Sequence, residues 1–127
     1  MKKIFLLLTM VALAFSSCKK EYISNSNNSQ TLSYKVYSNA WVTYDSGDSY
    51  SVSINVPEIT NYYSQYGQVS LYISFGNGAY EQIPEVYNDI SYSFSHSPGE
   101  VTIDVQDLTH QGITPPSNAT VKIVLTD

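Results

Sequence analysis

The sequence predicts an all-β protein whose body is a single antiparallel β-sandwich of about seven short strands. Three observations support this class. Apolar and polar residues alternate along most of the chain, which indicates strands with one buried face. Turn-forming residues interrupt the alternation at nearly regular intervals, and no long stretch has the spacing of an amphipathic helix. We therefore expect an immunoglobulin-like architecture, although the body has no cysteine for the disulfide typical of that fold.

The expected strands differ in how strictly they alternate. Strict alternation marks residues 50–56, 69–75, 92–95, 101–106 and 121–126, and weaker alternation marks 32–37, 41–44 and 80–83. Turns are expected at Asp45–Asp48, Gly76–Gly78 and Ser97–Gly99, because glycine, proline and aspartate favour reversal of the chain. Pro115 and Pro116 predict a loop over residues 114–118, because proline lacks the backbone donor that a central strand needs.

Residues 59–66 break the alternation. Thr60 stands where a side chain can cap the first turn of a helix. Gly67 follows at a position where a left-handed residue commonly ends one. We expect one short helical turn near residues 60–66.

The N-terminus has the pattern of a lipoprotein signal. A basic start, Met1-Lys2-Lys3, precedes an apolar run that ends at Phe15, and Ser16-Ser17-Cys18 follows at once. The apolar run is shorter than the roughly 20 residues of a spanning helix. We expect residues 1–17 to be a signal peptide that is removed, and Cys18 to be lipidated. Cys18 is the only cysteine of the chain, so lipidation also accounts for a thiol without a disulfide partner.

The remaining chain is expected to have two parts. Residues 18–30 comprise the lipidated cysteine and a polar, Asn- and Ser-rich segment that predicts a flexible tether. Residues 31–127 form the β-sandwich domain. Lys19, rather than aspartate, follows Cys18, and by the familiar sorting rule for bacterial lipoproteins this favours the outer membrane. We expect the protein to be anchored there by lipid and not to span the membrane.

The charge of the body excludes one class of partner. Its only basic side chains besides histidine are Lys35 and Lys122, and the chain contains no arginine. Nucleic-acid binding requires lysine and arginine to neutralise phosphates, so we exclude it. The absence of arginine also disfavours anionic ligands, which that side chain clamps through paired hydrogen bonds.

Several short motifs follow one another through the body. They are Val56-Pro57-Glu58-Ile59-Thr60, Gly67-Gln68-Val69-Ser70-Leu71-Tyr72, Ile83-Pro84, Tyr92-Ser93-Phe94, Gly99-Glu100-Val101-Thr102-Ile103 and Val121-Lys122-Ile123-Val124-Leu125. This layout resembles a group of small Bacteroidota lipoproteins with an immunoglobulin-like β-sandwich body. The resemblance covers most of the body and implies the fold and the envelope location. It implies no catalytic or binding residues, because the group has no established activity.

Catalytic chemistry finds little support in the sequence. No Gly-x-Ser-x-Gly motif occurs, and Cys18 is expected to carry lipid, so no nucleophile stands out. Imidazole and carboxylate groups suit zinc, and the candidate ligands are His96, His110, Asp104 and Asp107. Their spacing in the sequence does not match a known metal-binding motif. We expect no catalytic residues, no metal and no cofactor, and a small hydrolase or metal-dependent enzyme is the least favoured function.

Aromatic residues on strands and loops are the best candidates for ligand contact. Five of them are singled out: Trp41, Tyr44, Tyr72, Tyr80 and Tyr87. Tyrosine with serine and asparagine is typical of recognition surfaces. The alternative is that the tyrosines stabilise the sheets, since cross-strand aromatic pairs contribute about 0.2–1 kcal/mol each.

Two functions are consistent with these observations. The first is a non-catalytic, membrane-anchored lipoprotein that serves as a binding, accessory or structural module for an unknown protein or glycan partner. The second is a glycan-binding module in which Trp41 and exposed tyrosines stack on sugar rings. A continuous row of these rings on one face would favour the second function.

Overall fold

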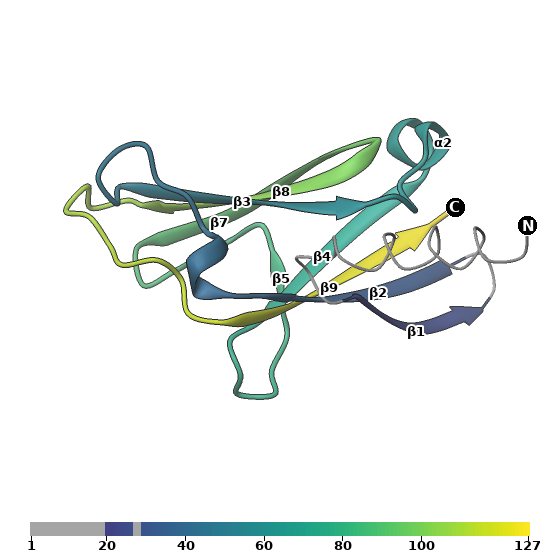
Figure 1. Ribbon diagram of the computed structural model, residues 1–127, viewed down its shortest axis with the longest axis horizontal. Coiled ribbons are helices and arrows are strands. Elements are labelled where there is room, and N and C mark those ends of the chain that lie inside the picture. Colours follow the sequence, from purple (N-terminus) through teal and green to yellow (C-terminus); the bar gives the residue numbers. More distant parts are fainter. Residues whose placement is uncertain (1–19, 27–28) are drawn as a thin grey trace, which may run out of the picture.

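The computed structural model describes residues 20–26 and 29–127, so the expected signal peptide and Cys18 lie outside the described residues. Two antiparallel sheets pack face to face (Figure 1). One has five strands in the order β1-β2-β9-β4-β5, and the other has four in the order β3-β8-β7-β6. The strands are β1 (Lys20–Ser26), β2 (Ser29–Val36), β3 (Ser49–Val56), β4 (Gln68–Ser74), β5 (Glu81–Ile83), β6 (Glu85–Tyr87), β7 (Ile90–Ser97), β8 (Gly99–Asp107) and β9 (Ala119–Thr126).

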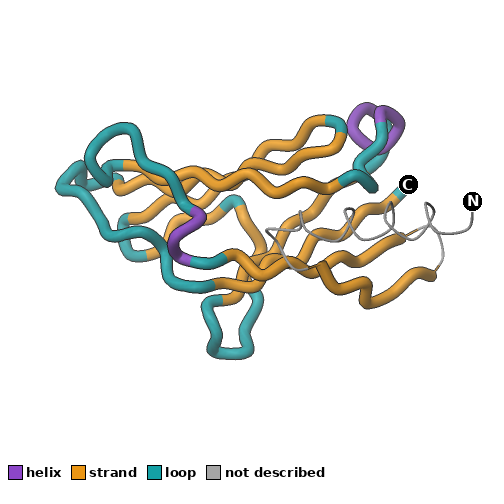
Figure 2. Tube along the Cα trace, in the orientation of Figure 1, coloured by secondary structure: helices purple, strands orange, loops and turns teal. Residues whose placement is uncertain are grey.

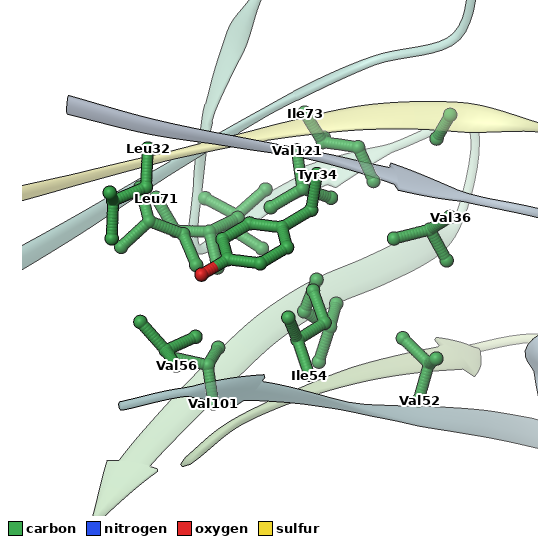
Figure 3. Packing of buried hydrophobic residues seen from close by; sticks show 14 of the residues in the cluster. Leu32, Tyr34, Val36, Val52, Ile54, Val56, Leu71, Ile73, Val101 and Val121 are labelled. Carbon is green, nitrogen blue, oxygen red and sulfur yellow. The ribbon is translucent and has the colours of Figure 1, made fainter. Parts of the chain in front are cut away.

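The alternating apolar residues form the core between the sheets. In β9 every second residue from Ala119 to Leu125 is buried, and the residues between them are partly exposed. Long uninterrupted pairings hold each sheet, from Ser29↔Thr126 to Val36↔Ala119 and from Ser49↔Gln106 to Val56↔Gly99. Figure 3 shows the side chains of both sheets pointing toward one another, with the Tyr34 ring among them. The all-β sandwich is thus confirmed, whereas the immunoglobulin-like arrangement is not.

The expected strand at residues 41–44 is absent. A single bridge pairs Val42 with Ser51, after a 3-10 turn, η2 (Ser38–Ala40). The side chains of Thr43 and Asp45 accept hydrogen bonds from nearby backbone N–H groups, Gly47 N at 2.9 Å and Ser49 N at 2.8 Å. Such local bonds compete with the bonds of a sheet, so they favour a turn here.

The expected tether is corrected by β1. Lys20–Ser26 pairs with β2, from Lys20↔Tyr34 to Ser26↔Ser29, and β2 itself begins at Ser29. The sheet therefore begins within the polar segment that predicted a tether, and not at Thr31. Strands pair through backbone groups, which a polar sequence also supplies, so the composition of this segment did not reveal the pairing.

The expected helical turn is confirmed as α2 (Asn61–Gln65). The Thr60 side chain caps it by accepting a hydrogen bond from Tyr63 N at 3.3 Å. Gly67, however, is not left-handed, and a Cβ there would lie 2.6 Å from Tyr63 Cδ1 and 3.1 Å from Thr126 O. Close packing therefore explains this glycine. No helix within residues 20–26 and 29–127 is long and apolar enough to cross a membrane.

Candidate functional site

A corner between the two sheets brings two glutamates together. The strands β5 and β6 are separated only by Pro84, yet they belong to different sheets. Glu81 in β5 lies opposite Ile73 of β4, and Glu85 in β6 lies opposite Tyr92 of β7. Because the chain crosses from one sheet to the other between them, Glu81 comes close enough to raise the pKa of the Glu85 carboxyl.

Two cavities lie along this corner, and both are lined by Phe75 and Tyr92. The rings of these two residues are tilted toward each other with centroids 6.1 Å apart. We call the two cavities together the corner cleft. Its apolar lobe has a volume of about 420 Å³ and is also lined by Ile90, Val105, Ile113, Thr114, Pro115, Pro116 and Ser117. Its acidic lobe, about 260 Å³, is also lined by Ile73, Asn77, Ala79, Glu81 and Tyr87.

The β4–β5 loop contributes one wall of the acidic lobe. It projects away from the body in Figure 2 and contains Asn77 and Ala79, which line the lobe. The Asn77 side chain accepts a hydrogen bond from Ala79 N at 3.1 Å, which stabilises the turn. Gly76 and Gly78 have φ angles of +97° and +79°, a conformation that glycine adopts at low cost. The expected turn at Gly76–Gly78 is therefore part of the site.

Asp107 organises the loop that forms the wall of the apolar lobe. Its buried carboxylate accepts hydrogen bonds from Thr109 N and Oγ1 at 2.9 and 2.7 Å, and from Gln111 N and Gly112 N at 3.0 and 2.9 Å. Because these donors stabilise the charged form, led by the Thr109 hydroxyl, they hold the pKa of Asp107 below its ordinary value. One side chain thus fixes the backbone that leads into Ile113.

Two further hydrogen bonds hold Ile113 in the wall. Its N–H donates to Gly47 O at 2.8 Å, and its carbonyl accepts from the Tyr50 hydroxyl at 3.1 Å. A Cβ at Gly47 would lie 2.8 Å from Ile113 O, so only glycine permits this approach. The expected turn at Asp45–Asp48 therefore helps to hold Ile113 in the wall of the apolar lobe.

Two acidic side chains lie at or beside the acidic lobe. Burial raises the pKa of the Glu85 carboxyl, and the neighbouring Glu81 carboxyl raises it further. Burial also raises the pKa of Tyr92, with added effects of Glu85 and Glu81. Among the described residues, no lysine or histidine forms an ion pair with either glutamate.

The five predicted contact residues do not form one surface. Trp41 is buried in the core, with 6% of its surface exposed, which corrects its expected role as a platform for sugar rings. Tyr44 is 94% exposed on the loop after it. Tyr72 and Tyr80 both contact Lys122, whose Nζ lies 4.6 and 4.8 Å from their ring centroids. Only Tyr87 belongs to the corner cleft.

Phe75 and Tyr92, which are central to the cleft, were not predicted as contact residues. Both occupy the apolar phase of a strand, a phase that predicts burial in the core. They pack against the core but remain partly exposed. The available signal was the turn at Gly76, which directly follows Phe75.

The four candidate metal ligands are not brought together. His96 is paired with Val101 near the β7–β8 turn, whereas His110 lies in the loop after β8. Asp104 accepts a hydrogen bond from Ser51, and the Asp107 oxygens are taken up by its loop. Within the described parts of the chain, no group of three or more histidine, cysteine or acidic side chains is arranged to hold a metal.

A shallow cavity of about 260 Å³ does join His110 to Asp45 and Asp48. His110 Nδ1 lies 2.9 Å from Asp48 Oδ2, and this hydrogen bond raises the pKa of the imidazole. Asp45 accepts hydrogen bonds from Ser49, which lower the pKa of its carboxyl. These side chains stabilise two adjoining turns, which explains their proximity.

No known protein family, curated protein or solved structure matches the chain. The corner cleft is therefore judged on its own geometry. It combines three aromatic rings, an amide and the Glu81 carboxylate, with Glu85 nearby, at the edges of a tightly packed sandwich. That arrangement suits binding of a ligand with both apolar and polar parts.

Proposed function

We propose that the protein is a lipid-anchored, non-catalytic binding module of the bacterial cell envelope, and that the corner cleft is its binding site. The cleft carries the proposal because its apolar lobe, at about 420 Å³, falls within the usual size of ligand pockets. Its walls are fixed by the Asp107 hydrogen bonds and by the sheet edges. A rigid, partly apolar site of this kind needs little ordering when a ligand binds.

The location rests on the N-terminal sequence. The signal pattern of residues 1–17 and the small residues before Cys18 support lipidation of that cysteine. Lys19 after it favours the outer membrane. A lipid anchor would place the cleft at the membrane surface, where it can meet a protein, a glycan or a smaller molecule.

A glycan is the second candidate ligand. Tyr87, Asn77 and Glu81 line the acidic lobe together, and rings with amide and carboxylate groups are suited to sugar recognition. The burial of Trp41 removes the widest ring from that role, so the candidate depends on the acidic lobe alone.

Catalysis is the least supported function. Of the two glutamates, only Glu81 lines the acidic lobe, whereas glycoside hydrolysis needs two carboxyl groups about 5–10 Å apart that flank the substrate. At the second cavity, both oxygens of Asp45 accept hydrogen bonds from Ser49, and Asp48 Oδ2 forms a hydrogen bond with His110 Nδ1. Neither place offers an activated nucleophile.

Capture of partners from intact cells tests the proposal. The full-length protein with its native anchor is cross-linked in place, recovered and compared with Tyr87→Ala, whose ring lines the cleft. Tyr44→Ala, which removes another exposed tyrosine ring that lies outside the cleft, is the matched control. We expect a partner that is lost from Tyr87→Ala and retained by Tyr44→Ala. Equal capture by both variants would contradict binding through the cleft.

A further inference from the structure

The two lobes of the corner cleft differ in chemistry, and this difference restricts the ligand. The apolar lobe is lined by Ile90, Ile113, Pro115 and Pro116, which offer no charge. The acidic lobe adjoins the Glu81 and Glu85 pair. Phe75 and Tyr92 line both lobes, so the two lobes adjoin each other. The site therefore favours an amphiphile with one apolar part and one polar part.

The charge of the acidic lobe indicates the sign of the polar part. Two neighbouring carboxylates repel each other when both are ionised, unless a cation lies close to them. The two lysines of the body are engaged elsewhere: Lys35 Nζ donates to Thr120 Oγ1 at 2.8 Å, and Lys122 lies between Tyr72 and Tyr80. Among the residues that the structure describes, neither glutamate forms an ion pair with a lysine or histidine.

Aromatic rings beside the glutamates add to the attraction for a cation. Tyr87 and Tyr92 line the acidic lobe together with Glu81. Aromatic faces attract ammonium groups within about 6 Å of the ring centroid, most strongly where water is excluded. The same chemistry already operates in this protein, where two tyrosine rings hold Lys122. The net charge of −5 also favours the approach of cations.

We propose that the corner cleft binds a small organic amine in its ammonium form, with the ammonium beside Glu81 and Glu85 and an apolar chain or ring in the apolar lobe. This inference rests on the proposed function and specifies the ligand of the same site. Each lobe then meets a part of the ligand with matching chemistry.

Calorimetric titration of the full-length lipidated protein in detergent tests the inference. The probe is 4-phenylbutylammonium, and the comparison compounds are 4-phenylbutanol, which is neutral, and 4-phenylbutyrate, which is anionic. We expect the ammonium compound to bind about tenfold more tightly than the alcohol, and the carboxylate not to bind. The three compounds share the apolar part, so the difference reports the charge.

Conservative variants locate the charge effect. Glu81→Gln and Glu85→Gln are each expected to weaken ammonium binding by about tenfold and to leave binding of the alcohol unchanged. Glu100→Gln, which alters an exposed glutamate of β8 outside the cleft, is the matched control and should bind as the wild type does. Thermal unfolding of each variant verifies that the fold is retained.

Three results would overturn the inference. They are equal affinity for the ammonium compound and the alcohol, an equal effect of Glu100→Gln, and no binding of any of the three compounds. None of these results would affect the capture of a partner that depends on Tyr87, so the proposed function would still stand. Loss of Tyr87-dependent capture together with intact amine binding would instead overturn the broader proposal of a macromolecular partner.

Discussion

Asp107 shows how one carboxylate can determine the shape of a site. Its two oxygens accept four hydrogen bonds from the loop that follows, and that loop presents Ile113 to the apolar lobe. An ionised carboxylate is the only common side chain that accepts on both oxygens. The residue therefore links a local turn to the wall of the cleft.

Substitution Asp107→Asn is expected to destabilise the protein, because the amide nitrogen would face backbone N–H donors without an acceptor. The folded pKa of Asp107 is lowered, so its contribution is complete above the unfolded value of about 3.9 and is lost as the pH falls through the folded pKa. Urea unfolding should therefore show a gap between wild type and variant at neutral pH that narrows below about pH 4.

Asp89→Asn is the control for this prediction. Asp89 is exposed with a φ of +59°, a conformation that asparagine also tolerates. Its unfolding curve should stay close to that of the wild type throughout. A gap for Asp107→Asn that is constant with pH would show that the charge of this carboxylate is not responsible.

Single aromatic residues were the least predictable part of the site. Tyr87 was predicted as a contact residue and lines the cleft, whereas Trp41 was predicted as one and is buried. A residue in a loop gives no alternation from which its direction can be read. Burial of Trp41 depends on how the sheets close over it, which local sequence does not specify.

At the scale of elements, the sequence predicts strands whose apolar and polar residues alternate and misses short or polar strands that lack this pattern. The strands β3, β4, β7, β8 and β9 lie where strict alternation placed them. By contrast, β1 and β6 sit at sheet edges and were not predicted. Edge strands are held by backbone pairing on one side, so their side chains need not alternate.

The junction of α2 and β4 depends on a glycine. A Cβ at Gly67 would meet the Tyr63 ring and Thr126 O, neither of which can withdraw without moving the helix or β9. Gly67→Ala is therefore expected to reduce the free energy of unfolding by about 1–3 kcal/mol. Denaturant unfolding measures this, with Gln68→Ala, at an exposed neighbouring position, as the control. Equal, small effects of both substitutions would contradict a tight contact at Gly67.

At the scale of the whole molecule, β1 changes the expected relation between body and membrane. Lys20 begins β1 and follows Cys18 by two residues. An extended chain spans at most about 3.3–3.6 Å per residue, so a lipidated Cys18 would hold the sheet edge within about 7 Å of the anchor. We expect the body to lie close to the bilayer and not at the end of a long tether.

Energy transfer from Trp41, the only tryptophan, to a fluorescent lipid headgroup measures this proximity in vesicles. A flexible Gly/Ser spacer inserted between Cys18 and Lys20 should lower the transfer, because it lets the body move away. Cys18→Ala, which lacks the anchor, gives the baseline. Transfer that is unaffected by the spacer would contradict a body held near the bilayer.

The cleft itself could not be predicted from the sequence. It forms because Pro84 separates two short strands that join different sheets, and no local pattern assigns a strand to a sheet. The sequence alone therefore gives no sign that Glu81 and Glu85 are neighbours. The sheet topology places them near each other. The sandwich, the helical turn and the loops could be predicted from the sequence, because each follows from local spacing or turn chemistry.

Incorporation of labelled palmitate tests most directly the claim that this protein acts from a lipid anchor. Wild type and Cys18→Ala are expressed in a bacterial host with the label, and the membrane and soluble fractions are compared. We predict label in the wild-type protein within the membrane fraction, and an unlabelled Cys18→Ala protein. Wild-type protein without label, or label that persists in Cys18→Ala, would contradict the account.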